Sequence, residues 1–206
     1  MNPARNDAIR LSRQDREQRS AGFMAGVSPD TDLLVTWIGL PKNKIILEVN
    51  PNSSRLTLPL AEAMKRGRVY TLTDSQEIAN RIQAQASGRP TDRLRVGTAD
   101  IQTATIIGKI NQFIDGQPID IALLWDSFSA IQPDRRTRVL RNLGWMLKPG
   151  GSLLLRSAIE QSPEQTEAEL NSLTQRTILR INEVAKLPGS SQNSLGFLAI
   201  KAVRDR

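Results

Sequence analysis

The chain has 206 residues, a length that suits one domain of ordinary size with its own hydrophobic core. It contains no cysteine, no histidine and no apolar run near the roughly 20 residues of a membrane span, which excludes disulfide bonds, cysteine or histidine chemistry and membrane insertion. We therefore expect a cytoplasmic protein. Its net charge of +7 would attract a nucleic acid or another acidic partner, but the basic residues are spread along the chain, and an ordinary solvated surface is the alternative interpretation.

The N-terminal segment differs from the rest of the chain. Residues 1–28 are polar and rich in arginine, and we interpret them as a basic arm that precedes a folded domain at residues 29–206. Ser28 and Pro29 predict the start of a helix that runs through about Leu40. Because the arm precedes this helix and mixes basic with acidic residues, we expect it to pack over the functional site as a lid.

Strands and helices alternate through the middle of the chain. Short apolar segments predict buried strands at 44–49, 68–73, 94–98, 119–125 and 151–158. Helical spacing of apolar residues predicts helices between them, at 53–67, 75–88, 101–116 and 133–147. Right-handed crossovers of this kind place helices on both faces of a parallel sheet.

The pattern changes after the fifth strand. Ser162 predicts the cap of a helix that starts at Pro163. Two further strands, 176–187 and 194–203, flank a turn-rich segment and have no helix between them. The fold class that we expect is α/β, with a doubly wound, mostly parallel seven-stranded sheet that ends in an antiparallel hairpin.

This order of elements resembles the class I, Rossmann-like S-adenosylmethionine-dependent methyltransferases over roughly residues 30–204. Four segments carry the resemblance: ILEVNPNSSRLTLPLAEAM, GRVYTLTDS, VGTADIQT and LRNLGWMLKPGGSLLL. The Leu-Lys-Pro-Gly-Gly turn is the most specific of them, although its proline and glycines serve mainly to turn the chain from helix to strand. The resemblance implies a site at the carboxyl ends of the strands, with S-adenosylmethionine as cofactor.

The first of these segments departs from the family pattern. Members of the family usually carry an acidic residue after the first strand and then three spaced glycines. The acid matches Glu48, whereas the glycine positions match Asn50, Asn52 and Ser54. Asparagine tolerates positive φ better than other non-glycine residues, but its side chain takes room where the methionine end of the cofactor would lie. The glycine motif is therefore degenerate.

Two aspartates match the family's nucleoside contacts. The position of the ribose-binding carboxylate is occupied by Thr73, and Asp74 follows one residue later. Asp74 is either the ribose ligand or a helix cap beside Ser75. Asp100 matches the acid that hydrogen-bonds the adenine amine, with Ile101 against the ring, although a loop aspartate without a ligand is the alternative.

Trp125 and Asp126 follow the fourth strand, where family members face the methyl donor and the acceptor. Trp125 either borders the methyl group or packs in the core. Asp126 is the one carboxylate that this position offers as a base or as an acceptor-orienting group, which makes it the candidate catalytic residue. No Asn-Pro-Pro-Tyr type sequence occurs there, so amino-methylation of a base lacks its usual signature.

Two functions are compatible with these residues. The first is a methyltransferase for a small-molecule or macromolecular acceptor, since direct methyl transfer can rely on proximity and orientation without a histidine. The second is a catalytically inactive binding or regulatory protein, which the lost glycines and the displaced ribose carboxylate favour. A nicotinamide-dependent oxidoreductase would need a glycine-rich fingerprint after the first strand and would not bring the terminal hairpin. The sequence predicts neither the acceptor nor the oligomeric state.

Overall fold

The computed structural model describes residues 37–39, 43–125, 127–159, 162–187 and 197–205. The chain divides into two units, Met1–Gly39 and Leu40–Arg206. The arm expected at residues 1–28 lies outside the described residues, so its role as a lid stays a prediction. The second unit carries the sheet.

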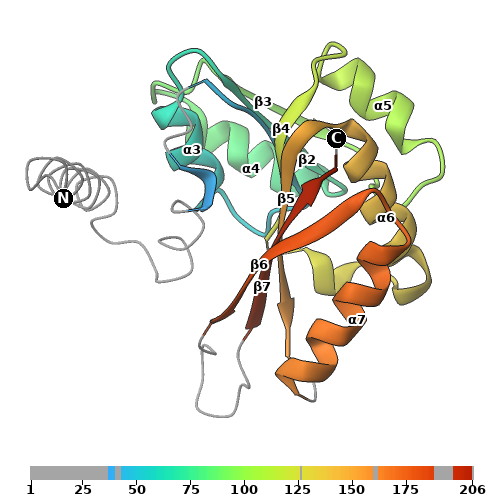
Figure 1. Ribbon diagram of the computed structural model, residues 1–206. Helices are drawn as coiled ribbons and strands as arrows, with labels where there is room; N and C mark the ends of the chain where they lie inside the picture. The colour runs from blue at the N-terminus through green and yellow to red at the C-terminus, as the bar shows by residue number, and fades with distance from the viewer. Residues whose placement is uncertain (1–36, 40–42, 126, 160–161, 188–196, 206) are drawn as a thin grey trace, which may run out of the picture. The chain divides into compact units, whose positions relative to one another are not determined.

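A seven-stranded sheet with the order β3-β2-β1-β4-β5-β7-β6 forms the centre of this unit (Figure 1). Strands β1 to β5 pair in parallel, whereas β7 pairs antiparallel with both β5 and β6. The strands are β1 (Ile45–Val49), β2 (Arg68–Thr73), β3 (Leu94–Thr98), β4 (Ile119–Leu124), β5 (Leu147–Ala158), β6 (Leu179–Leu187) and β7 (Phe197–Arg204). This topology confirms the expected mostly parallel sheet with a terminal antiparallel pair.

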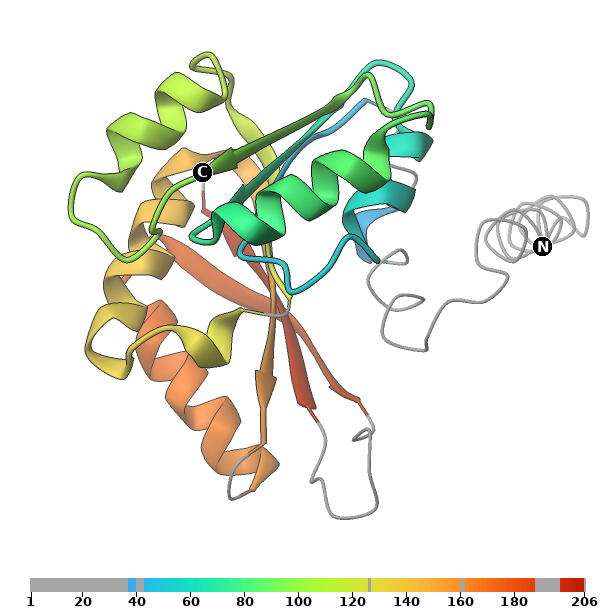
Figure 2. The same cartoon turned by 180° about the vertical axis from the view of Figure 1, so that it is seen from behind.

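Helices cover both faces of the sheet (Figure 2). One face carries α3 (Thr57–Ala63) and α4 (Gln76–Ala86). The other face carries α5 (Ile106–Phe113), α6 (Pro133–Met146) and α7 (Pro163–Gln175), and a short 3-10 helix, η1 (Phe128–Ala130), follows β4. None of the described helices is long and apolar enough to cross a membrane.

Two helices begin at the caps that the sequence predicts. The Ser75 side chain accepts a hydrogen bond from the Ile78 N–H at the start of α4, and Ser162 accepts one from the Gln165 N–H at the start of α7. Gly88 has a φ of +78° just beyond α4, a conformation that glycine adopts without steric cost. These local signals fix the ends of the helices independently of the core.

α3 is shorter than the sequence predicts, ending at Ala63 instead of continuing to Gly67. The chain must turn there because it passes directly over the start of β1. A Cβ atom at Gly67 would lie 2.1 Å from the Lys44 carbonyl oxygen. β5 also differs, because it begins at Leu147 and includes the Lys-Pro-Gly-Gly segment as an irregularity in its pairing with β4. Steric contact and strand pairing therefore override the pattern at both places.

The apolar face of α6 anchors the sheet. Val139, Leu140 and Leu143, which the sequence places on one side of this helix, have no exposed surface. They pack in one core cluster with Leu47 and Leu153 from the sheet. Burial of each such side chain stabilises the fold by roughly 1.5–3 kcal/mol. The strands thus form a rigid support for the loops at both of their ends.

Candidate functional site: the carboxyl edge of the sheet

Strands β1 and β4 are neighbours at the centre of the sheet, and their connections leave in opposite directions. Doubly wound sheets bind ligands beyond the carboxyl ends of the strands at such a switch point. Ser127, in the loop after β4, donates a hydrogen bond from Oγ to the Val49 carbonyl at 2.8 Å and is buried. This bond joins the loop after β4 to the end of β1. We call the loops that follow β1 to β4 the carboxyl edge.

Glu48 lies beneath the first of these loops. It is 3% exposed, and its Oε2 accepts hydrogen bonds from the hydroxyls of Thr57 at 2.6 Å and Thr71 at 3.1 Å. A buried carboxylate needs such donors, because burial without them is costly. Glu48 therefore joins β1, β2 and the first residue of α3, and it supports the loop at the methionine end of the predicted cofactor site. Neither threonine could be singled out from the sequence.

Asn50 has a left-handed backbone conformation of the kind that glycine adopts most readily. Its φ is 46°, in the left-handed region, and its backbone N–H donates to the Leu72 carbonyl at 2.7 Å. Its side-chain Oδ1 accepts from the Asp74 N–H at 3.0 Å, and its Nδ2 donates to Asp74 Oδ2 at 3.3 Å. The side chain that replaces the glycine hydrogen thus holds the candidate ribose ligand.

Asp74 is exposed, whereas the residue before it is buried and the residue after it caps a helix. Thr73 is fully buried, with its hydroxyl accepting from the Ser75 N–H at 3.2 Å. Ser75 supplies the cap of α4, so the alternative interpretation of Asp74 as that cap is not needed. The carboxylate of Asp74 instead contacts Asn50 across the gap between two loops. Its contact with a ribose stays a prediction.

Asp100 organises the loop after β3. One carboxylate oxygen, Oδ1, accepts from the Gln102 N–H at 2.8 Å, while the Asp100 carbonyl accepts from the Thr103 N–H at 3.2 Å. These turns delay the start of α5 from residue 101 to Ile106. Among the described residues, the other oxygen, Oδ2, accepts no hydrogen bond, and the side chain is exposed. Ile101 is 1% exposed and packs in the core, so its contact with an adenine ring stays a prediction.

α6 holds the same loop through contacts that the sequence does not reveal. Arg138 donates from Nη2 to the Gln102 carbonyl at 2.6 Å, and the Gln102 side chain accepts from the Gln132 N–H at 2.9 Å. Nε of Arg138 is buried and has no hydrogen-bond partner in the described part of the chain. The guanidinium is therefore held beside the loop without saturating its donors. No sequence signal separates Arg138 from the other arginines of this helix.

Trp125 follows β4 and is 6% exposed. Its carbonyl accepts a hydrogen bond from Nε of Arg156 at 3.2 Å. The Arg156 guanidinium carbon lies 5.8 Å from the Trp125 ring centroid and 4.3 Å from that of Phe197, so the cation contacts both aromatic rings. Arg156 therefore ties together β5, β7 and the loop after β4. A lone charge near the end of an apolar strand was the sequence signal that could have identified it.

Two further predicted site residues are less well defined. Asp126, the candidate catalytic residue, lies outside the described residues, and its role stays a prediction. Asn52 is exposed in the loop after β1, two residues beyond Asn50. The structure thus brings Asn50 and Asp74 into contact and places Asp100 in the loop after the neighbouring strand, because β2 and β3 pair through Thr73 and Thr98.

Comparison with known proteins agrees with this geometry at the level of the fold. Neither a family model nor a curated protein sequence matches the chain. The N-methyltransferase NodS from Bradyrhizobium japonicum WM9, in complex with S-adenosyl-l-homocysteine, is similar with a TM-score of 0.66 at 18% identity, over 86% of this chain and 86% of that one. Magnesium protoporphyrin IX methyltransferase ChlM from Synechocystis PCC 6803, with bound S-adenosylhomocysteine, has a TM-score of 0.65 at 16% identity, over 97% of each chain.

A third similar structure is the [4+2]-cyclase SpnF, with a TM-score of 0.67 at 14% identity, over 85% of this chain and 79% of that one. Together with the strand order and the antiparallel pairing of β7, these similarities show that the chain has the class I methyltransferase fold. The expected fold class is confirmed. At these identities the likeness defines the fold, and the reaction has to be argued from the site.

Proposed function

We propose that the carboxyl edge binds S-adenosylmethionine and that the protein is a methyltransferase for a small molecule. The observation that carries the proposal is the Asn50–Asp74 pair. Asn50 adopts a left-handed conformation at the position that matches the family's first glycine, and both of its amide atoms hold Asp74 at the end of β2. The pair fixes the Asp74 carboxylate at the place where the resemblance puts the ribose.

The polar groups at this edge match the chemistry of the cofactor. Ribose hydroxyls and an adenine amine donate hydrogen bonds, and the exposed carboxylates of Asp74 and Asp100 accept them. Both aspartates carry negative charge, which favours a ligand with a positive sulfonium. Asn50 and Asn52 would line the methionine end, above the buried Glu48. The residues present therefore fit the group.

The bound cofactor supplies a methyl group activated by the sulfonium. The role of the protein is then to hold an acceptor in line with that group and to exclude water. Trp125, fixed by Arg156, would border the methyl position, and Asp126 would orient the acceptor or take its proton. Ser127 holds this loop against the end of β1.

A small-molecule acceptor is supported by one of the similar structures. ChlM is described as a magnesium protoporphyrin IX methyltransferase, and its fold is similar over 97% of this chain. A binding or regulatory protein without methyl transfer is the second candidate. The side chains of Asn50 and Asn52 in place of glycine favour it, and the similar fold of a [4+2]-cyclase indicates that this architecture is not restricted to methyl transfer.

Calorimetric titration with S-adenosylmethionine and S-adenosylhomocysteine tests the proposal on the full chain. We expect both ligands to bind. Asp100→Ala removes one hydrogen-bond acceptor and should weaken binding by about 1–3 kcal/mol, roughly ten-fold or more in Kd. Asp92→Ala is the matched control, because Asp92 is an exposed aspartate just before β3, at the other end of the same strand, and its removal should leave Kd unchanged.

Two outcomes would contradict the proposal. Absence of binding by the native chain would leave the fold without its cofactor and support the second candidate. Equal affinity of native protein and Asp100→Ala would place the adenine elsewhere.

A further inference from the structure

Basic side chains gather at the opposite edge, where the parallel strands begin. Lys44 directly precedes β1, Arg68 begins β2 and Arg93 directly precedes β3. The strands are paired here, because the Arg68 N–H donates to the Lys44 carbonyl at 2.9 Å and the Val69 N–H donates to the Arg93 carbonyl at 2.9 Å. Neighbouring strands lie about 4.8 Å apart. The backbones of the three residues therefore form a row across the starts of adjacent strands, with Lys44 one position out of register with Arg68.

The turn between α3 and β2 adds two more cations to this row. Lys65 and Arg66 are both exposed, and Gly67 follows them. A Cβ atom at Gly67 would lie 2.1 Å from the Lys44 carbonyl oxygen and 2.6 Å from the Lys44 nitrogen, so the turn lies directly on the start of β1. We call the five cations the basic edge: Lys44, Lys65, Arg66, Arg68 and Arg93.

The charge of the basic edge is largely unneutralised. Apart from Arg93, none of its members forms an ion pair with a described residue. Arg93 faces Asp92 at 3.8 Å in an exposed pair of the kind that contributes little. Lys148 lies at the same end of the sheet, but it forms an ion pair with the buried Asp120. Positive charge is therefore concentrated at the starts of β1, β2 and β3.

The basic edge lacks the apolar surface that other kinds of partner need. The large hydrophobic side chains exposed in the described part of the chain are Trp145 and Val184, on α6 and β6, and neither belongs to this row. Protein interfaces usually contain an apolar core, and interfacial membrane binding needs apolar side chains that enter the lipid. Binding to a phosphate backbone needs only closely spaced cations.

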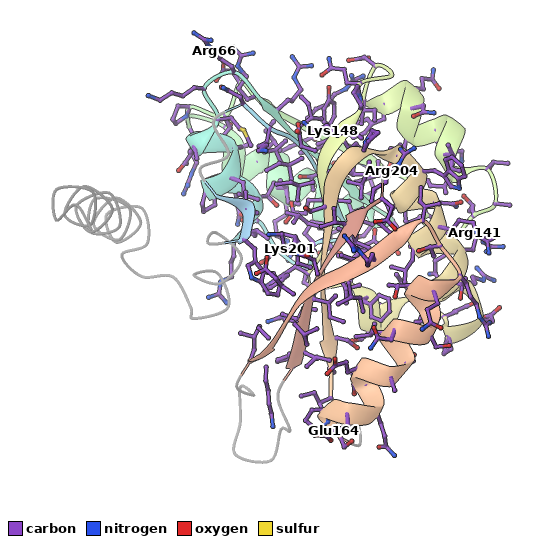
Figure 3. The ribbon with its side chains drawn as sticks, viewed as in Figure 1. Arg66, Arg141, Lys148, Glu164, Lys201 and Arg204 are labelled. Atoms are coloured by element: carbon purple, nitrogen blue, oxygen red, sulfur yellow. The ribbon has the colours of Figure 1, made fainter. Side chains whose placement is uncertain are left out.

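We infer that the basic edge binds the phosphate backbone of a nucleic acid, independently of its base sequence. The net charge of +7 favours the encounter. The surface is distinct from the proposed cofactor site, because Asp74 and Asp100 follow the carboxyl ends of the same strands. In Figure 3, Arg66 and Lys148 lie at one end of the unit and Glu164 lies at the other. The inference therefore does not depend on methyl transfer.

Fluorescence anisotropy with a labelled uridine oligonucleotide, measured over a series of salt concentrations, tests this inference on the full chain. The variant Lys65→Gln/Arg66→Gln/Arg68→Gln removes three cations from the basic edge. The control Arg81→Gln/Lys109→Gln/Arg176→Gln removes three exposed cations from α4, α5 and the end of α7. Thermal melting of both variants verifies that they fold.

We expect the native chain to bind at low salt, and the basic-edge variant to bind about ten-fold or more weakly. The slope of log K against log salt should fall by about 2 units, since each phosphate contact on a single strand contributes about 0.7. The control should keep most of the native affinity and slope. Equal losses in the two variants would show attraction by net charge alone and overturn the assignment. Binding to anionic phospholipid vesicles without binding to the oligonucleotide would overturn it as well.

Discussion

The two ends of the parallel strands carry opposite kinds of surface. At the carboxyl edge, the Asp74 carboxylate accepts a hydrogen bond from Asn50 Nδ2 at 3.3 Å, and the Asp100 carboxylate accepts one from the Gln102 N–H at 2.8 Å. At the basic edge, Lys65 and Arg66 are exposed side chains of a turn and have no ion-pair partner among the described residues. One end therefore presents acceptors in fixed positions, and the other presents cations on long side chains.

This difference indicates two modes of recognition. Fixed acceptors select a ligand whose donors match their positions, and their contribution depends little on salt. Long cationic side chains bind a polyanion in many arrangements, and their contribution falls steeply as salt rises. The same sheet supports both modes, because strand pairing fixes the ends of the strands and the loops supply the chemistry.

We expect the largest effect from Gly67→Ala, because this substitution disturbs the backbone that carries the basic edge. The added Cβ would lie 2.1 Å from the Lys44 backbone, so the turn and the start of β1 must separate. We expect a loss of about 3 kcal/mol of unfolding free energy in a denaturant titration. Gly108→Ala in α5 is the control, because a Cβ there meets no atom within 4 Å and should stabilise the helix by about 0.5–1 kcal/mol. Equal stabilities of the two variants would refute the steric account.

A smaller effect is expected from Asn50→Gly combined with Asn52→Gly, which sharpens the account of the carboxyl edge. Asn50 holds Asp74 with both atoms of its side-chain amide, so its loss should free the carboxylate. We expect the affinity for S-adenosylhomocysteine to fall by about 1 kcal/mol, roughly five-fold, in calorimetry. An inactive binding protein predicts the opposite, because glycine restores space and backbone freedom where the methionine end must lie. Tighter binding by the double variant would therefore favour that second candidate.

The smallest effect concerns Glu164, an exposed acid at the start of α7. Hydrogen bonds from its own backbone N–H and from Ser162 lower the pKa of this carboxyl below its ordinary value of 4.5, with Lys186 contributing further. The ionised form is favoured in the folded state. The resulting stability is fully present above pH 4.5 and is lost as the pH falls through the lowered pKa. Glu164→Gln should therefore flatten the acid limb of a stability profile slightly, and an NMR titration midpoint at or above 4.5 would contradict the prediction.

The fold was predictable because its signals are local and repeated. Ser75 and Ser162 mark helix starts, and the alternating apolar segments give the strands. The helix boundaries that differ from the predicted ones are set by contacts between residues distant in sequence or by the structure of a loop. α3 ends early because the turn at Gly67 lies against the Lys44 backbone, and α5 starts late because Asp100 organises the loop before it.

The site was less predictable because its residues act in pairs that sequence spacing does not reveal. The positions of Asn50 and Asp74 follow from the family pattern, but the bond between them depends on the register of β1 and β2. Arg156 reaches Trp125 across a strand pair, and Arg138 reaches the loop after β3 from α6. Such contacts require the three-dimensional arrangement.

One measurement tests the separation of the two edges most directly: calorimetric titration of S-adenosylhomocysteine into native protein, Asp74→Ala/Asp100→Ala and Lys65→Gln/Arg66→Gln/Arg68→Gln. We expect binding by the native chain, a loss of about ten-fold or more in the aspartate variant and unchanged affinity in the basic-edge variant. Absence of binding by the native chain, or an equal loss in the two variants, would contradict this separation.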